Sequence, residues 1–299
     1  MASAPELHSN VTDTALIFEG GGMRAALTSA VVATLLKQGI YFDWVAGVSA
    51  GTSNSVNYVA RDAARARKSF VEFAADPNFG SVRTFLRGQG LFNAEYIYEQ
   101  TSLPDQALPF DWQTFIANPA DLHISAFNGT TGQAVVWSKK DLHEMRDLMV
   151  RVRASSTMPL LMPPVNIDGN LYVDGALNSH GGIALSVAQE AGFGKFFVVL
   201  TQERDYVKPA EKRPGLFRRH FRKMPAVAEA VIARPDRYNA TREELFELER
   251  QGKAYLFVPE TMPVSNGEKS VAKLAAAHEL GLIQARKELP AWREFLNLA

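Results

Sequence analysis

The sequence predicts an α/β fold with a mainly parallel central sheet. Near the start of the chain the expected elements alternate as strand, helix, strand, helix, which is typical of parallel strands joined by right-handed crossovers. Later strands are again short apolar runs that end in turn residues. The chain has 299 residues, of which 46% are hydrophobic and 21% charged, a composition typical of a folded globular protein.

Apolar periodicity and turn residues define the elements of the first half. The run before the glycines at 20–22 is a buried strand, the Ala- and Leu-rich stretch after them is a helix, and Gly39 ends that helix. The expected elements are strand 14–19, helix 23–38, strand 43–48 and helix 50–75. We expect residues 1–12 to form a loose N-terminal tail and residues 13–299 to form a single domain.

The second half continues the alternation after residues 76–121, a segment rich in Pro, Gly and aromatic residues. Two strands joined through residues 129–132 predict a hairpin, and Asp141 is the expected N-cap of the helix that follows. The expected elements are strands 122–128, 133–138, 171–173, 196–201 and 255–258 and helices 141–156, 237–251 and 270–288.

Composition excludes several classes of function. Lys plus Arg and Asp plus Glu both number 32, so the chain has no net charge to attract nucleic acid. The absence of cysteine excludes disulfides, cysteine-ligated metals and thiol catalysis. No cluster of carboxylates points to a metal, and no cofactor is expected. Because no signal peptide is evident and the apolar stretch 25–36 is too short to span a bilayer, we expect a cytoplasmic protein whose membrane contact, if any, is peripheral.

A nucleophile motif follows the second expected strand. Gly47, Ser49 and Gly51 fit the pattern G-x-S-x-G, at the strand-to-helix turn that a nucleophile elbow requires. The flanking glycines leave room where a side chain would clash, so that the Ser49 hydroxyl stands clear of the sheet. A serine that only caps the following helix is the alternative, and this motif alone does not decide between them.

A glycine loop follows the first expected strand. Its backbone N–H groups and the start of the next helix can hold an anion, including the oxyanion of an acyl-transfer reaction. The loop has the sequence Gly20-Gly21-Gly22-Met23-Arg24. Because a cation in the first turn opposes the helix dipole, we expect Arg24 to pair with a carboxylate that braces the loop, or else to meet an anionic part of the ligand.

The same glycines, followed by Ala25, also satisfy the dinucleotide fingerprint G-x-G-x-x-G/A. A dinucleotide site wants an acidic residue at the carboxyl end of the second strand. In this sequence Ser49 stands there and Asp43 stands at the opposite end, so the pattern disfavours a dinucleotide.

Asp174 is the third candidate for a functional site. It closes the strand 171–173 and is followed at once by Gly175, as an ordinary turn aspartate also would be. Parallel strands bring their carboxyl ends to one edge of a sheet, so we expect Asp174, Ser49 and the glycine loop to meet there. None of the six histidines has such a position, and the nearest in sequence, His180, is expected to be a loop residue.

Together these blocks resemble those of the patatin-like phospholipases, particularly the bacterial members. The glycine loop is similar to G-G-G-x-R/K, residues 47–51 to G-x-S-x-G, and Asp174-Gly175-Ala176 to D-G-G/A. Residues 154–164 resemble the Ser- and Pro-rich segment that the family places before its aspartate. The stretches 234–239 and 252–254 resemble bacterial members too.

The resemblance implies a three-layer α/β/α sandwich that hydrolyses acyl esters of lipids with a Ser–Asp dyad and no catalytic histidine. Ser49 would be the nucleophile and Asp174 its base. The glycine loop would supply the oxyanion hole through Gly21, Gly22 and Met23, with Arg24 supporting it.

Two other functions remain open at this point. An α/β-hydrolase esterase would use the triad Ser49, Asp174 and His278, which has the chain order of that fold but a nucleophile after an unusually early strand. A non-enzymatic protein would bind a lipid or a phosphate with the glycine loop and use Ser49 only as a helix cap.

Weaker features concern the substrate and the membrane. Met158, Leu161 and Met162 lie just before Asp174 and are candidates for the wall of an acyl pocket, although core packing explains them equally well. Candidate lid residues are Phe79, Phe85, Leu86, Leu91 and Phe92. The segment Arg204–Lys223 holds eight Lys and Arg residues against two acidic ones, and we expect it either to dock on anionic headgroups or to be a solvated loop.

Overall fold

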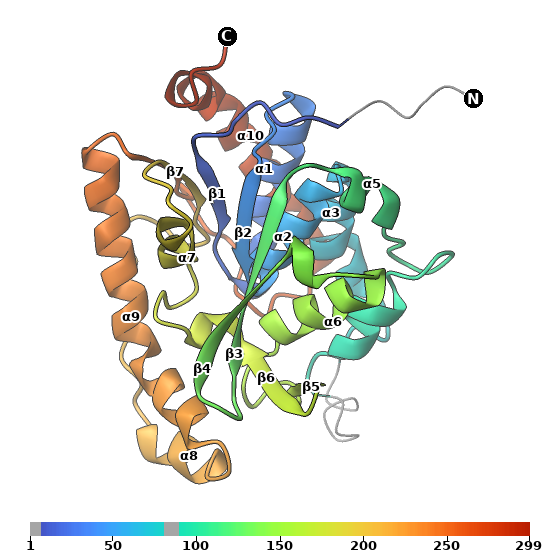
Figure 1. The fold of residues 1–299 in the computed structure, drawn as a ribbon, viewed down its shortest axis with the longest axis vertical. Helices are drawn as coiled ribbons and strands as arrows, with labels where there is room; N and C mark the ends of the chain where they lie inside the picture. Colours follow the sequence, from blue (N-terminus) through green and yellow to red (C-terminus); the bar gives the residue numbers. More distant parts are fainter. Residues whose placement is uncertain (1–6, 81–89) are drawn as a thin grey trace.

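A single sheet organises the part of the chain that the computed structural model describes, residues 7–80 and 90–299. Its strands are β1 (Ala15–Phe18), β2 (Trp44–Val48), β3 (Asp121–Asn128), β4 (Gln133–Ser138), β5 (Val165–Ile167), β6 (Asn170–Asp174), β7 (Phe196–Val199) and β8 (Ala254–Phe257). They lie in the order β5-β6-β3-β2-β1-β7-β8, and β4 pairs with β3 (Figure 1).

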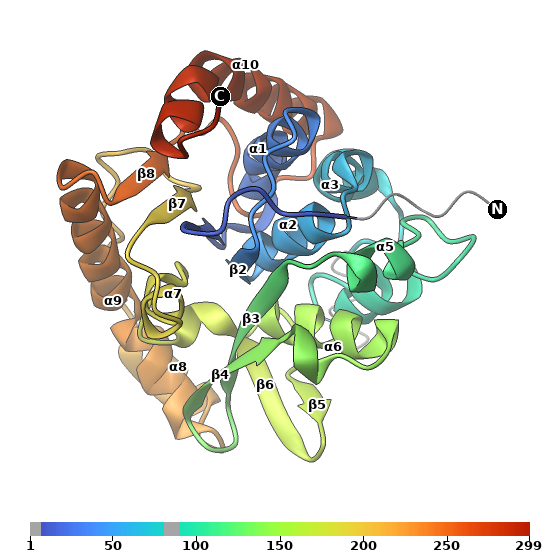
Figure 2. The same ribbon diagram turned by 45° about the horizontal axis from the view of Figure 1, so that its top comes forward.

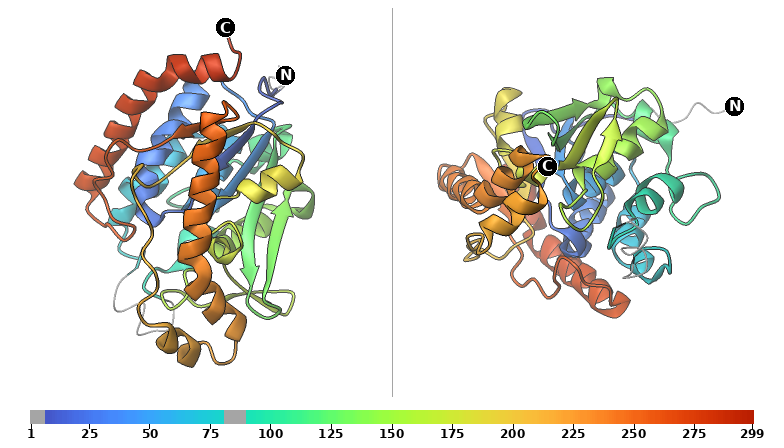
Figure 3. Two further views of the ribbon diagram at one scale, coloured as in Figure 1. Left: turned by 90° about the vertical axis from the view of Figure 1, so that its left-hand side faces the viewer. Right: turned by 90° about the horizontal axis from the view of Figure 1, so that it is seen from below.

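Helices cover both faces of this sheet. The α-helices are α1 (Ala25–Lys37), α2 (Ala50–Val59), α3 (Ala63–Phe70), α5 (Trp112–Ala117), α6 (Met145–Ser155), α7 (Leu185–Glu190), α8 (Pro214–His220), α9 (Pro225–Arg250) and α10 (Val271–Phe295). Single turns are η1 (Gly22–Arg24), η2 (Glu72–Ala75), η3 (Tyr96–Gln100), η4 (Lys139–Asp141) and η5 (Gly175–Leu177). Helices α1, α2 and α10 lie on one face, and α7 and α9 lie on the other (Figure 2 and Figure 3).

Alternation along the strands explains the three layers. In β1, Leu16 and Phe18 pack in the core beneath α1, whereas Ala15 and Ile17 pack in the core beneath α7 and α9. All four side chains are buried, because a strand covered on both faces needs apolar residues at every position. The expected three-layer α/β/α sandwich is confirmed.

The sheet is parallel in its middle and antiparallel at one edge. Strands β3, β2, β1, β7 and β8 run parallel to one another, whereas β4 and β6 run antiparallel to β3. Strand β3 pairs with β2 up to Ser125 and then extends beyond it, and β6 pairs with that extension, placing Asp174 opposite Ala126. The prediction that Asp174 ends a parallel strand is therefore wrong in direction. It reaches the expected edge because an antiparallel strand runs back along the overhang of β3.

Two of the predicted helices differ in their bounds from the helices of the structure. The predicted helix over 50–75 is broken after α2 by a turn in which Arg61 has a left-handed φ of 57°, and the Asp62 side chain then caps α3. Asp141 is not the N-cap of α6, because Glu144 caps that helix in a capping box with Asp147. The carboxylate of Asp141 instead accepts from the backbone of Ser138.

The predicted loose tail is shorter than residues 1–12. Both Asn10 and Val11 donate backbone hydrogen bonds to the carbonyl of Tyr41, at 2.8 and 3.0 Å, and the Val11 side chain is buried in the core. At the other end of the chain, α9 and α10 continue through Pro235 and Pro290, so both helices are longer than expected.

Candidate active site

The nucleophile candidate, Ser49, lies in a strained turn between β2 and α2. Its φ of 56° and ψ of −128° are outside the regions that a residue with a side chain ordinarily adopts. Neighbouring groups hold this geometry: the Ser49 N–H donates to Ser155 Oγ at 3.0 Å, and its carbonyl accepts from Thr52 at 2.9 Å. Such strain at a strand-to-helix turn is typical of a nucleophile elbow and is not needed for a simple helix cap.

Close approach of backbones explains the two glycines around Ser49. A Cβ on Gly51 would lie 2.2 Å from the carbonyl oxygen of Phe18, at the end of β1. A Cβ on Gly47 would lie 2.6 Å from the backbone of Gly51. The first turn of α2 therefore packs directly on the end of β1, beside Ser49.

The glycine loop lies beside Ser49, and only part of it has free N–H groups. The amide of Gly20 donates to Gly182, Met23 donates to Asn266, and Arg24 donates to Gly21. Within residues 7–80 and 90–299, the N–H groups of Gly21 and Gly22 have no protein acceptor. The expectation that Met23 also offers its N–H is wrong, because the carbonyl of Asn266 already accepts it at 3.0 Å.

Arg24 lacks the expected carboxylate partner among the residues that the structure describes. It forms no ion pair with any residue that the structure describes, and its Nε is buried without an acceptor. The side chain lines a surface hollow together with Tyr206 and Met262. The loop is braced instead by Glu19, whose carboxylate accepts from the Thr201 N–H at 2.6 Å.

Asp174 is buried at the carboxyl end of β6. Its Oδ1 accepts from the Ala176 N–H at 2.8 Å, and its own N–H donates to the Thr157 carbonyl at 2.9 Å. Burial raises the pKa of Asp174, while the positive charge of Arg234, the hydrogen bond from the Ala176 N–H and the nearby Ser49 hydroxyl act in the opposite direction. Ser49 is thus close enough to Asp174 to influence its pKa, and the raised pKa makes this carboxylate a stronger base than an exposed one.

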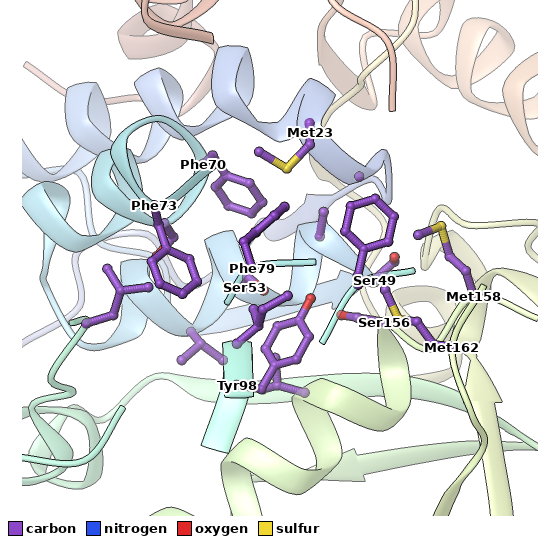
Figure 4. A pocket seen from close by; sticks show the side chains of 18 of the residues that line it. Met23, Ser49, Ser53, Phe70, Phe73, Phe79, Tyr98, Ser156, Met158 and Met162 are labelled. Carbon is purple, nitrogen blue, oxygen red and sulfur yellow. The ribbon is translucent and has the colours of Figure 1, made fainter. Parts of the chain in front are cut away.

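An apolar cavity of about 80 Å³ opens at Ser49. Aromatic and sulfur-containing side chains surround it, including Phe70, Phe73, Phe79, Met158 and Met162 (Figure 4). Two of the three expected wall residues therefore line it. The third, Leu161, does not, and its carbonyl accepts from the Leu91 N–H at 2.7 Å instead.

The expected lid residues have different positions. Phe79 and Phe92 are buried and form part of the cavity wall. Leu91 is partly buried and packs against the same core. Phe85 and Leu86 lie outside the described residues.

The sequence did not single out Tyr98, which enters this cavity from η3. The phenol lies beside Ser53 and Ser156 near Ser49 (Figure 4). Burial raises the pKa of Tyr98, the nearby Ser156 lowers it, and the charge of Asp174 raises it further. The segment η3 is a turn of π-helix, a feature common at functional sites, but nothing in its local sequence predicts that conformation.

The structure does not form the Ser-His-Asp triad. Nδ1 of His278 lies 2.9 Å from Ser29 Oγ and 3.3 Å from the Ala26 carbonyl oxygen, both on α1. A triad needs that nitrogen to face Asp174. His180 is a buried loop residue, as expected, and burial lowers its pKa to about 4.

Two features are absent from the residues that the structure describes, 7–80 and 90–299. Among them no group of three or more His, Cys, Asp or Glu side chains is placed to hold a metal ion. None of their helices combines the length and the apolar character needed to cross a bilayer.

Comparison with known proteins places the chain in a family. Residues 16–184 match the model of the patatin-like phospholipases, and residues 224–297 match a domain of unknown function (DUF6363). The lysophospholipase NTE1 of Mycosarcoma maydis is 27% identical over 192 residues, which are 59% of this chain and 9% of that much longer protein. The crystal structure of VipD from Legionella pneumophila matches 97% of this chain and 68% of its own, with a TM-score of 0.51 at 12% identity.

The first match covers more than half of the chain and includes the glycine loop, the elbow and Asp174. The similarity to VipD supports only the fold of this chain, because the two sequences are 12% identical. The chain belongs to the patatin-like phospholipase family.

Proposed function

We propose that this protein is a serine hydrolase of lipid acyl esters that works through a dyad of Ser49 and Asp174. The observation that carries the proposal is the strained Ser49, which lines an apolar cavity and lies near the buried Asp174. The adjacent glycine loop offers the N–H groups of Gly21 and Gly22, which have no acceptor among the residues that the structure describes. The family match and the name of the M. maydis relative support an ester of a lipid as the substrate.

Acylation begins when Asp174 accepts the proton of the Ser49 hydroxyl. The serine oxygen attacks the ester carbonyl, and the negative charge develops on the carbonyl oxygen. The N–H groups of Gly21 and Gly22 are free to donate to that oxyanion, where loss of one donor typically costs about 3–4 kcal/mol. Asp174 then returns the proton to the leaving alcohol, and Ser49 carries the acyl group.

Deacylation repeats these steps with water. Asp174 takes a proton from a water molecule, the hydroxide attacks the acyl-serine ester, and the same amides hold the second oxyanion. Collapse of the intermediate releases the fatty acid and returns the proton to Ser49. Throughout, the apolar wall of Phe70, Phe73, Met158 and Met162 accommodates the acyl chain.

A panel of esters tests the proposal. Lysophospholipids, phospholipids, triacylglycerols and p-nitrophenyl esters are offered to the wild type, to Ser49→Ala and to Asp174→Asn. Turnover of at least one lipid ester that both substitutions abolish supports the proposal. Turnover that survives Ser49→Ala, or a wild type that hydrolyses none of these esters, contradicts it and leaves the binding-protein alternative.

Peripheral contact with an anionic membrane through the segment Arg204–Lys223 belongs to the same proposal. Leu216 is 55% exposed on α8, and Arg219, Arg222 and Lys223 are exposed beside it. Arg218 is not free for lipid, because it forms a two-pronged ion pair with Glu229.

Helix α8 is also anchored close to the candidate dyad. Its Phe217, together with Phe221, packs in a cluster that includes Leu160 and Leu177, which flank the cavity wall and Asp174. A membrane bound at α8 would thus lie near the site where the ester is cleaved.

A further inference from the structure

A stripe of arginine and tyrosine side chains outside the candidate site lies on one face of α9. Residues Arg234, Tyr238 and Arg242 repeat every four positions, so they form a stripe along the helix. Tyr238 is 1% exposed and Arg242 is 2% exposed. This part of the chain falls within residues 224–297, the stretch that matches a domain of unknown function.

Arg234 of this stripe and the adjacent Arg237 form hydrogen bonds to the loop that follows Asp174. Arg234 Nε donates to the Gly181 carbonyl at 3.1 Å, and Arg237 Nη1 donates to the Leu177 carbonyl at 2.8 Å. The loop also lies against the helix itself, since a Cβ on Gly181 would be 2.5 Å from the backbone of Tyr238.

The same face of α9 is also hydrogen bonded to Glu19, the residue from which the glycine loop starts. Tyr238 Oη donates to Glu19 Oε1 at 2.7 Å, and Glu19 Oε2 accepts from the Thr201 N–H at 2.6 Å. Glu19, 2% exposed, is the last residue before the glycines. The two loops also meet directly, because the Gly20 N–H donates to the Gly182 carbonyl at 3.1 Å.

We propose that α9 is a clamp that holds the loop after Asp174, residues 175–182, against the glycine loop, and that Arg234 is the positioning residue that acts on Asp174. The hydrogen bonds above connect both loops to one rigid helix, so a shift of either loop would have to break several of them. The proposal rests on the proposed function, and it gives the C-terminal stretch a role in the reaction.

Electrostatics supports the assignment of Arg234. Its positive charge lowers the pKa of Asp174 against the effect of burial. The other groups that interact with this carboxylate are the Ala176 N–H, Ser49 and Tyr98. Burial holds His180 neutral by lowering its pKa to about 4. Arg237 is not among the groups that act on Asp174, although it bonds to the same loop.

The test compares Arg234→Gln and Arg234→Lys with a matched control, Arg237→Gln. Each variant is assayed for kcat/KM against pH on a soluble p-nitrophenyl ester. Loss of the neighbouring charge should move the acidic limb of Arg234→Gln up by about one pH unit, a roughly tenfold loss of kcat/KM below that limb. Arg234→Lys should restore the wild-type limb, and Arg237→Gln should leave the limb in place even where kcat falls.

A second measurement follows Asp174 without turnover. Carboxyl ¹³C NMR of the aspartate-labelled protein, with Asp174→Asn identifying the resonance, should show the same upward shift in Arg234→Gln. An unchanged titration of Asp174 in Arg234→Gln overturns the inference. If the wild type hydrolyses no ester, the proposed function fails, and the NMR titration still decides the effect of Arg234 on Asp174.

Discussion

At the residue scale, the site depends on backbone contacts that tolerate no side chain. Ser49 is held at a positive φ because α2 begins directly against the end of β1, with Gly51 at the point of contact. The packing of α2 against β1 thus imposes the backbone strain at Ser49, and the favourable free energy of folding offsets the cost of that strain.

Gly51→Ala should disturb both stability and activity. The new methyl would meet the Phe18 carbonyl, and overpacking of this kind costs about 1–3 kcal/mol. Urea unfolding measures the loss. Gly194→Ala is the control, because a Cβ there meets nothing within 4 Å, and its free energy of unfolding should change by less than about 0.5 kcal/mol. Equal stability of the two variants would contradict this account of the elbow.

Asp174→Asn should lower kcat and raise stability at neutral pH. Loss of a general base typically costs 10²–10⁴-fold in rate. The pKa of Asp174 is raised in the folded state, so the folded protein binds this proton more tightly than the unfolded chain does. Its contribution to stability is therefore present below the unfolded pKa of about 3.9 and is lost as the pH rises through the folded pKa.

Urea unfolding across pH checks the sign of that effect. The advantage of Asp174→Asn over the wild type should grow from near pH 4 towards pH 7. A variant that is less stable than the wild type at pH 7 would show that the ionised carboxylate supports the fold, contrary to the raised pKa.

At the scale of elements, local pattern predicts most of the helices and strands but not how they pair. The apolar runs before the glycine loop and before Ser49 identify β1 and β2 directly. The direction of β6 depends on the overhang of β3, which is a property of the assembled sheet. Strand β5 has three residues, which are too few for a recognisable pattern. The first half of α9 could not be predicted either, because Pro235 within it is a residue that usually ends a helix.

The same limit applies to the candidate site. Ser49, the glycine loop and Asp174 could be predicted because each lies in a short contiguous motif. Tyr98 and Arg234 could not, because their relation to Asp174 exists only after folding brings distant elements together.

Tyr238→Phe tests the clamp as a structural element. Removal of the hydroxyl leaves a buried Glu19 oxygen without its donor, which should cost about 1–3 kcal/mol of unfolding free energy. Tyr206→Phe is the matched control, since its hydroxyl donates to no residue that the structure describes, and should be nearly neutral. Thermal and urea unfolding measure both, and a neutral Tyr238→Phe would remove the link between α9 and the glycine loop.

At the scale of the whole molecule, the two matched segments, residues 16–184 and 224–297, contribute strands to the same sheet. The N-terminal match contributes β1 and β2, while β8, which lies in the C-terminal match, joins the same sheet through β7. The C-terminal match also supplies α10, which packs on α1 so closely that a Cβ on Gly281 would be 2.3 Å from the Leu27 carbonyl oxygen. The C-terminal stretch is therefore part of the body that holds the site.

The charge distribution predicts how the molecule meets a membrane. Reversal of Arg219, Arg222 and Lys223 to Glu should abolish sedimentation with vesicles rich in phosphatidylglycerol, because each cation near such a surface contributes about 1 kcal/mol. The control reverses Lys68, Lys140 and Arg286, which are exposed elsewhere and change the net charge equally. Equal vesicle binding by the two triple variants would exclude α8 as the docking surface.

The central claim is that Ser49 forms a covalent acyl-enzyme with Asp174 as its base. Its most direct test is intact-mass and peptide mass spectrometry after reaction with a fluorophosphonate probe. We expect a single adduct on the peptide that contains Ser49, none in Ser49→Ala, and labelling of Asp174→Asn slowed at least 100-fold. An adduct on another residue, or equal labelling of Asp174→Asn and the wild type, would contradict the claim.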